Sequence, residues 1–302
     1  MTQAVFTIVK PIAVTPAMRL STNVADEALP AWVAKNYVLG DQVVSDRAIW
    51  ECKQAGNSAT APVKGDPLWL RVRAVNSWAA LDRQKLTPTR HSGTATYVFK
   101  PGEAISAFAA INLEECRWIT VRMVDPDFGE VYNQTHVVGE MPIGADWHSF
   151  LIMPWEWADD SQGFFLDLPT FPNAELHIEF VGTAGLEIGA MLFGMARQFG
   201  AGINWGLELG LKDYSSKEAD KYSEVEIVER FAADTVDSTP VIYTSEMTLL
   251  HRYLKGLRAT PALYIHVAEQ ASTNVYALFQ DMRIVMSNKK YSQLSIRLES
   301  LL

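Results

Sequence analysis

The chain has 302 residues, of which 48% are hydrophobic and 20% charged, a composition typical of a soluble globular protein with room for two or three cores. Its formal net charge of −9 excludes the basic footprint that nucleic-acid binding requires. No apolar run approaches the ~18 residues of a membrane helix, and the first ten residues lack the pattern of a signal peptide, so we expect folding in a cytoplasm.

The first 30 residues are expected to form an extended segment with two short strands, residues 7–9 and 12–14. Residues 31–82 then form a small β-module, because they combine several Trp and Tyr residues, a Gly40-Asp41 turn and β-branched strands. A module of this size has too few aliphatic side chains for a core, so aromatic rings must bury its apolar area.

The aromatic rings of this module have two alternative roles. Exposed Trp and Tyr rings stack on the apolar faces of pyranose sugars, and nearby polar groups fix the orientation of the sugar. The same rings are also the main material for the module's own core, and the small size of the module favours that role. The candidate glycan-binding residues are Trp32, Tyr37, Trp50 and Trp69.

A β-sandwich is expected next, over residues 94–200. The polar, turn-rich residues 83–93 mark the boundary before it. Short candidate strands then recur at near-regular spacing with turn residues between them, a pattern that predicts a sandwich of the jelly-roll kind. The expected strands are residues 94–99, 105–113, 118–124, 130–137, 147–153, 176–180 and 186–193.

The last part of the chain, residues 206–302, is expected to be a small α+β domain. The glycine-rich stretch 200–206 lacks the spacing of a phosphate-binding loop and is interpreted as a flexible joint before it. Residues 245–256 carry apolar side chains at helical spacing, with Ser245 as the expected N-cap. The expected strands are residues 224–232, 263–267, 278–286 and 291–298. The predicted fold class is therefore mainly β: an aromatic β-module, a β-sandwich and a C-terminal α+β domain.

Sequence motifs for catalysis are missing. We find no phosphate-binding loop, no Gly-x-Ser-x-Gly elbow, no zinc-protease motif and no Cys-x-x-Cys pair, so no enzyme activity, cofactor or metal site is predicted. Both cysteines are expected to be reduced. Residues 155–160 interleave aromatic and acidic side chains, and Glu156, Asp159 or Asp160 could serve as the acid and base of a glycosidase. A surface loop with solvated carboxylates is the simpler interpretation.

Three other polar groups have simple interpretations. The run 125–130 offers alternate oxygens and a glycine, but its spacing departs from a calcium-binding loop, and a hairpin turn explains it. His177 and Glu179 point the same way on a strand and could form an acid–base pair, although a cross-strand role is simpler. The charged run 213–222 is interpreted as a solvated loop, with an intersubunit contact as the alternative because tyrosines are frequent at interfaces.

The aromatic module resembles the small chitin-binding type of carbohydrate-binding module. The order of residues in that family is found here at Trp32, Tyr37, Gly40-Asp41-Gln42-Val43, Trp50-Glu51-Cys52, Pro62 and Trp69. This resemblance covers about a seventh of the chain. It implies a compact β-fold whose aromatic residues contact a glycan.

Over most of its length the chain resembles structural proteins of tailed bacteriophages and prophages. In these, a module of this type is followed by a segment like Asn76-Ser77-Trp78-Ala79-Ala80-Leu81-Asp82, a β-sandwich, stretches like 213–215 and 228–230, and a compact α+β domain. The resemblance implies a non-enzymatic, multi-copy component of the tail or baseplate, located in the virion and assembled in the bacterial host cytoplasm. The implied partners are other copies of the chain, other tail proteins and host surface polysaccharide, with no nucleic acid and no membrane. Two alternatives stay open: a soluble carbohydrate-binding adsorption protein and a glycan-degrading enzyme.

Overall fold

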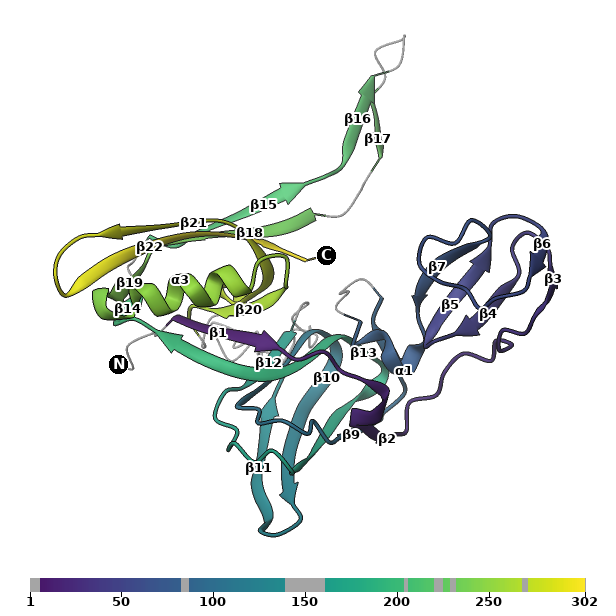
Figure 1. Ribbon diagram of the computed structural model, residues 1–302, viewed down its shortest axis with the longest axis horizontal. Coiled ribbons are helices and arrows are strands. Elements are labelled where there is room, and N and C mark those ends of the chain that lie inside the picture. Colours follow the sequence, from purple (N-terminus) through teal and green to yellow (C-terminus); the bar gives the residue numbers. More distant parts are fainter. Residues whose placement is uncertain are drawn as a thin grey trace, which may run out of the picture.

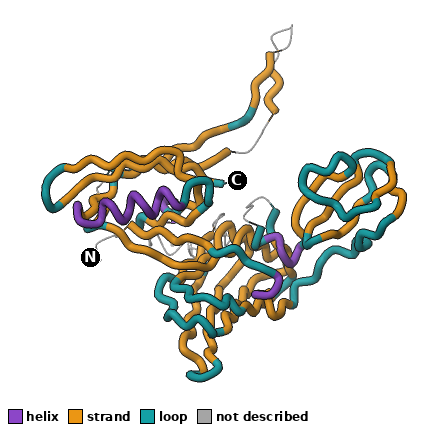
Figure 2. The backbone as a smooth tube through the Cα atoms, viewed as in Figure 1, coloured by secondary structure: helices purple, strands orange, loops and turns teal. Residues whose placement is uncertain are grey.

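A computed structural model of the chain describes residues 6–82, 87–138, 161–203, 206–219, 225–228, 232–267 and 271–301. Three lobes are visible in Figure 1: an aromatic module on the right, a β-rich lobe below the centre, and a C-terminal lobe on the left that carries the longest helix. Strands dominate all three lobes (Figure 2), so the predicted fold class is confirmed. The expected strand 147–153 and the acidic segment 155–160 lie outside the described residues.

The aromatic module is built from two small antiparallel sheets. One sheet pairs β3 (Lys35–Tyr37) with β6 (Gly56–Ser58), and the other has the order β4 (Gln42–Ser45), β5 (Ala48–Cys52), β7 (Trp69–Ala74). Its core consists of Tyr37, Val43, Ala48, Trp50, Cys52 and Trp69. Aromatic rings therefore supply most of the buried volume, as the small size of the module requires.

Two long strands, β10 (Ala107–Asp125) and β13 (Glu175–Phe199), form the middle of the central lobe and pair with each other along most of their length. Each fuses two of the expected short strands, so the prediction of separate strands is wrong here. The reason is a set of β-bulges: the register shifts on either side of Cys116, and Asn112 and Glu115 have positive φ values of 53° and 52°. Bulges and turns share local sequence signals, because both need unusual backbone angles.

Shorter elements complete this lobe. They are η1 (Pro16–Met18), β2 (Arg19–Thr22), α1 (Asn76–Ala79), β8 (Thr89–His91), β9 (Thr94–Phe99), β11 (Gly129–Val137) and β12 (Ser161–Phe165). The core between them is rich in phenylalanine and contains Phe99, Phe108, Phe165, Phe180 and Phe193. Both cysteines, Cys52 and Cys116, are free and buried.

The N-terminal strand β1 (Phe6–Pro11) joins the central and C-terminal lobes. It pairs on one side with β13 and on the other with β20 (Ala262–Ile265). A single sheet therefore runs through both lobes in the order β11-β10-β13-β1-β20-β21-β22-β18-β15. At the β1–β13 contact a Cβ on Gly194 would lie 2.0 Å from the Lys10 carbonyl oxygen, so only glycine fits.

The C-terminal lobe packs one helix, α3 (Met247–Gly256), on a strongly curved sheet. The other elements are β14 (Gly202–Ile203), β15 (Glu208–Asp213), β16 (Ser216–Ala219), β17 (Val225–Val228), β18 (Ala232–Ser238), β19 (Pro240–Tyr243), η2 (Thr244–Glu246), η3 (Ala271–Thr273), β21 (Val275–Met286) and β22 (Tyr291–Ser300). Leu250, Leu254 and Leu257 bury the helix stripe against Val236, Ile242 and Leu294, which confirms the helical periodicity. Within the described ranges, no helix combines the length and apolar character needed to cross a bilayer.

Two local expectations in this lobe are wrong. Ser245 does not cap the helix, because it lies inside the 3-10 turn η2 that precedes α3. The glycine-rich joint is also tied down rather than free at its start: the Gly200 N–H donates to Glu246 Oε2 at 3.0 Å, and a Cβ on Gly200 would meet the Val241 carbonyl oxygen.

Candidate functional site

The four aromatic residues predicted to bind glycan come together in the module, but mainly as its core. Tyr37, Trp50 and Trp69 are each 5% exposed or less. Tyr37 and Trp69 pack edge to face, with ring centroids 4.8 Å apart. Trp32 packs beside them and is half-buried. A sugar can therefore reach the ring of Trp32 but not the faces of the other three.

The polar atoms of these rings are satisfied inside the module. The indole N–H groups of Trp32 and Trp69 both donate to Ser58 Oγ, at 3.1 and 3.0 Å, and that hydroxyl donates to the Thr60 carbonyl oxygen. The Trp50 indole donates to the Ser45 carbonyl oxygen. Buried Trp N–H groups usually find such partners. Ser58 thus holds two indoles at once, a role that no sequence signal indicated.

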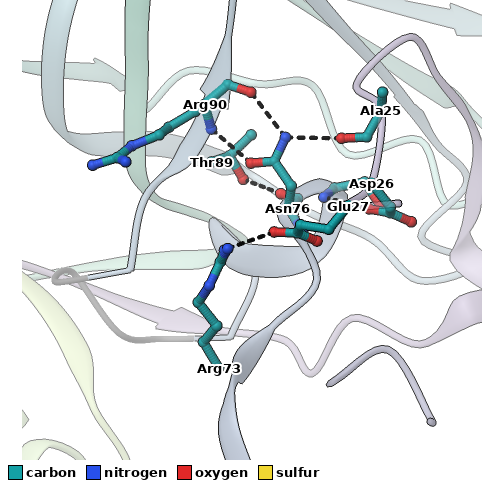
Figure 3. Close-up of polar contacts among 8 residues, drawn as sticks. Ala25, Asp26, Glu27, Arg73, Asn76, Thr89 and Arg90 are labelled. Carbon is teal, nitrogen blue, oxygen red and sulfur yellow. Dashed lines mark hydrogen bonds and ion pairs between the residues drawn. The ribbon is translucent and has the colours of Figure 1, made fainter. Parts of the chain in front are cut away.

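A polar junction fixes the segment that leaves the module, and Asn76 is at its centre (Figure 3). The Asn76 side-chain amide donates to the carbonyl oxygens of Ala25 and Arg90, both at 2.9 Å, and its oxygen accepts the Arg90 N–H at 2.8 Å. The Thr89 hydroxyl donates to the Asn76 carbonyl oxygen at 2.7 Å. One side chain therefore links the extended N-terminal segment to strand β8.

Acidic side chains complete this junction. Glu27 accepts the Asn76 backbone N–H at 3.0 Å and pairs with Arg73 at 2.7 Å, while Asp26 accepts the Ser77 N–H. The next ring, that of Trp78, is buried with the guanidinium group of Arg19 4.2 Å from its centroid. The Asn76-Ser77-Trp78 motif is therefore an anchor for the chain after the module.

The predicted acid–base pair of His177 and Glu179 is not formed. His177 Nε2 lies 3.7 Å from Glu175 Oε2, and burial, followed by the charge of Arg122, lowers the pKa of His177. In the β10–β11 turn, Asp125 Oδ1 accepts the backbone N–H groups of Asp127 and Phe128, so the hairpin interpretation of that acidic run is confirmed.

A serine–histidine pair in the C-terminal lobe was not anticipated from the sequence. Ser238 Oγ lies 2.8 Å from His266 Nε2, and His266 Nδ1 lies 2.7 Å from the Thr273 carbonyl oxygen. Since a carbonyl only accepts, Nδ1 carries the proton, and Nε2 accepts from the serine hydroxyl. This is the arrangement of an activated nucleophile. Both side chains, however, are 2% exposed or less, and burial lowers the pKa of His266 to about 4. The pair therefore has a structural role: its buried hydrogen bonds connect β18 to the segment around Thr273.

The most exposed feature of the C-terminal lobe is a hairpin arm formed by β15, β16, β17 and β18, which projects beyond the sheet (Figure 1). All six residues of β15 are exposed, and Leu209 and Leu211 keep 53% and 69% of their surface in solvent. On its outer side, β15 has no partner strand among the described residues. The expectation of a loop over 213–222 is wrong for Asp213, which ends β15, and for residues 216–219, which form β16; residues 220–222 lie outside the described residues.

The base of this arm is fixed by a carboxylate. Glu299 accepts from the ammonium group of Lys212 at 3.2 Å and from the side chains of Tyr214 and Gln280. The hydrogen bond from Tyr214, then that from Lys212, lowers the pKa of Glu299. The polar face of the arm is therefore anchored, while its leucines lie on the opposite face of β15.

Comparison with known proteins gives no match: no family model, no curated protein and no solved structure matches the chain. Function therefore has to follow from the chemistry of the surfaces themselves.

Proposed function

We propose that the chain is a non-enzymatic structural protein that is built into a phage tail or baseplate in several copies. The observation that carries this proposal is the hairpin arm, whose edge strand β15 is exposed along its whole length with two leucines in solvent. The location in a tail or baseplate is supported by the sequence resemblance of the chain to tail proteins of phages and prophages.

An exposed edge strand is a template for another strand, because its outer N–H and C=O groups have no partner in the sheet. Proteins that stay monomeric commonly protect such edges. A second chain that adds a strand to β15 would satisfy these groups and bury Leu209 and Leu211 together. When the partner surface lies elsewhere on the next copy, the contact is head-to-tail and closes into a ring if the rotation permits.

The test is the molar mass of the full chain in solution, measured by light scattering at micromolar concentration. We expect an oligomer for the wild type and a shift toward monomer for Leu211→Glu, because a charge would be buried at the new interface. Leu249→Glu is the matched control, since Leu249 is 49% exposed but lies on α3, away from the arm. A wild-type monomer, or equal effects of the two substitutions, would refute assembly through the arm.

The location is tested separately by quantitative mass spectrometry of purified phage particles, normalised to the major capsid protein. Several copies per particle support a tail or baseplate component. Absence from particles would overturn the virion assignment, whatever the oligomeric state of the isolated chain.

A further inference from the structure

The outer face of the central lobe is an ordered grid of side chains on four adjacent strands, β9, β13, β10 and β11. The strand registers align these residues in rows across the sheet. The first row is Thr94, Val181, Trp118 and Val137; the second is Thr96, Glu179, Thr120 and Thr135; the third is Val98, His177, Arg122 and Asn133. The face opposite carries the phenylalanine-rich core.

An aromatic platform occupies the first row. Trp118 is 39% exposed, in contrast to the buried tryptophans of the module. Its direct neighbours on the two flanking strands are Val181 and Val137, so the ring lies on a small apolar floor. A half-exposed Trp on a rigid strand presents a flat face at little conformational cost.

The second and third rows are polar and hollowed. A depression of about 330 Å³ is lined by residues of these rows, among them Thr96, Thr120, Arg122, Asn133 and Glu179. The hydroxyls of Thr120 and Thr135 lie 3.0 Å apart, and each keeps further hydrogen-bonding capacity. The first of these hydrogen-bonding groups, on Thr120, is two residues from Trp118 along β10. The rise of a strand places the two residues about 7 Å apart.

Only part of the charge on this face is balanced within it. Arg122 lies 3.6 Å from Glu130 and offsets the charge of that carboxylate. His177 lies 3.7 Å from Glu175, but burial lowers the pKa of His177, so near neutral pH the imidazole is uncharged and leaves the Glu175 carboxylate unbalanced. Glu179 is exposed, and its carboxylate makes no hydrogen bond or ion pair within the described part of the chain. The surplus charge on the face is therefore negative, from the carboxylates of Glu175 and Glu179, which repel anionic ligands and accept hydrogen bonds from hydroxyl groups.

We propose that this face binds a neutral oligosaccharide, with one sugar ring stacked on Trp118 and the next ring over the depression, hydrogen-bonded by Thr120, Arg122 and Glu179. The site is distinct from the aromatic module, and the proposal does not rest on assembly through the arm. The apolar area around Trp118 is confined to one ring and two valines. Such a small apolar patch beside a polar depression suits a sugar, which has an apolar ring face with hydroxyl groups around it, so we assign a glycan and not a second copy of the chain as the ligand.

The experiment is isothermal titration calorimetry of the full chain with chitotetraose, cellotetraose and mannotetraose, and with tetragalacturonate as the anionic comparator. We expect at least one neutral tetramer to bind and tetragalacturonate to bind more weakly. Trp118→Ala should weaken binding by about tenfold or more, because the stacking surface is lost. Trp118→Phe, which keeps a ring, should lose less.

One control variant and one further test variant complete the experiment. Phe128→Ala removes an exposed ring from the tip of the same hairpin, off the grid, and should leave the affinity unchanged. Trp118→Ala could weaken binding by destabilising the fold, which a lower melting temperature would reveal. Thr120→Ala is a smaller change on the same face, and it should weaken binding without that loss of stability. The proposal is overturned if no neutral tetramer binds, if Trp32→Ala abolishes binding while Trp118→Ala does not, or if Trp118→Ala changes the molar mass of the chain instead of its glycan affinity.

Discussion

Replacement of Asn76 tests whether the junction after the aromatic module is an anchor. Asn76→Ala removes three side-chain hydrogen bonds, two to carbonyl oxygens and one from a backbone N–H. At about 1 kcal/mol each, the free energy of unfolding should fall by roughly 2–3 kcal/mol. Asn76→Asp has the same shape but sets a carboxylate oxygen against the carbonyls of Ala25 and Arg90. We expect it to cost at least ~1 kcal/mol more than the alanine variant.

The assay is urea unfolding followed by circular dichroism at pH 7 and at pH 4. At the lower pH the introduced carboxyl group gains a proton that it can donate to a carbonyl oxygen, so the gap between the two variants should narrow. Asn173→Ala is the matched control, because Asn173 is exposed in a turn, and it should change stability by less than about 0.5 kcal/mol. The anchor would be refuted if Asn76→Asp were as stable as the wild type at pH 7.

Three further predictions concern the interior. Ser58→Ala leaves two indole N–H groups without their acceptor and should cost roughly 2–4 kcal/mol, read from tryptophan fluorescence during urea unfolding; an unchanged midpoint contradicts it. Gly194→Ala places a Cβ against the Lys10 carbonyl oxygen and should lower stability by about 2 kcal/mol or more, measured as a drop in melting temperature. His266 has its pKa lowered from 6.5 to about 4, so the unfolded state binds its proton more tightly. Stability should therefore fall by up to roughly 3 kcal/mol as the pH drops from 6.5 toward 4, a loss that His266→Gln should reduce.

Local periodicity was enough to locate the longer helix, α3, and many of the strands. The stripe that includes Leu250, Leu254 and Leu257 predicted α3, and the alternation in residues 291–298 predicted β22, because each pattern reflects a single buried face. The turn chemistry of Asp125 likewise predicted the hairpin between β10 and β11. These features depend on neighbours in the sequence.

Features that depend on distant residues could not be predicted in the same way. The bulges near Cys116 were interpreted as strand ends, because a residue with positive φ and a turn residue look alike in sequence. The place of β1 is set by its pairing with β13 and β20, which lie far from it in the sequence, as in the pairs Phe6–Phe199 and Thr7–Ile265. For the same reason, the sequence pointed to the aromatic residues of the module as candidates but did not show which of their rings are exposed in the fold. Trp118 was predicted only as part of a strand, since its exposure depends on the edge strand that flanks it.

The shared sheet gives the two proposed surfaces a mechanical relation. The Trp118 face lies at the β11 end of the strand order, and the hairpin arm lies at the β15 end. Between them, β1 is hydrogen-bonded to both lobes, to β13 on one side and to β20 on the other. In the proposed assembly, the two surfaces would therefore be connected by strand pairing through β1. Gly194→Ala strains this connection without touching either surface. If the two surfaces act independently, that variant should keep its glycan affinity and its molar mass while losing stability.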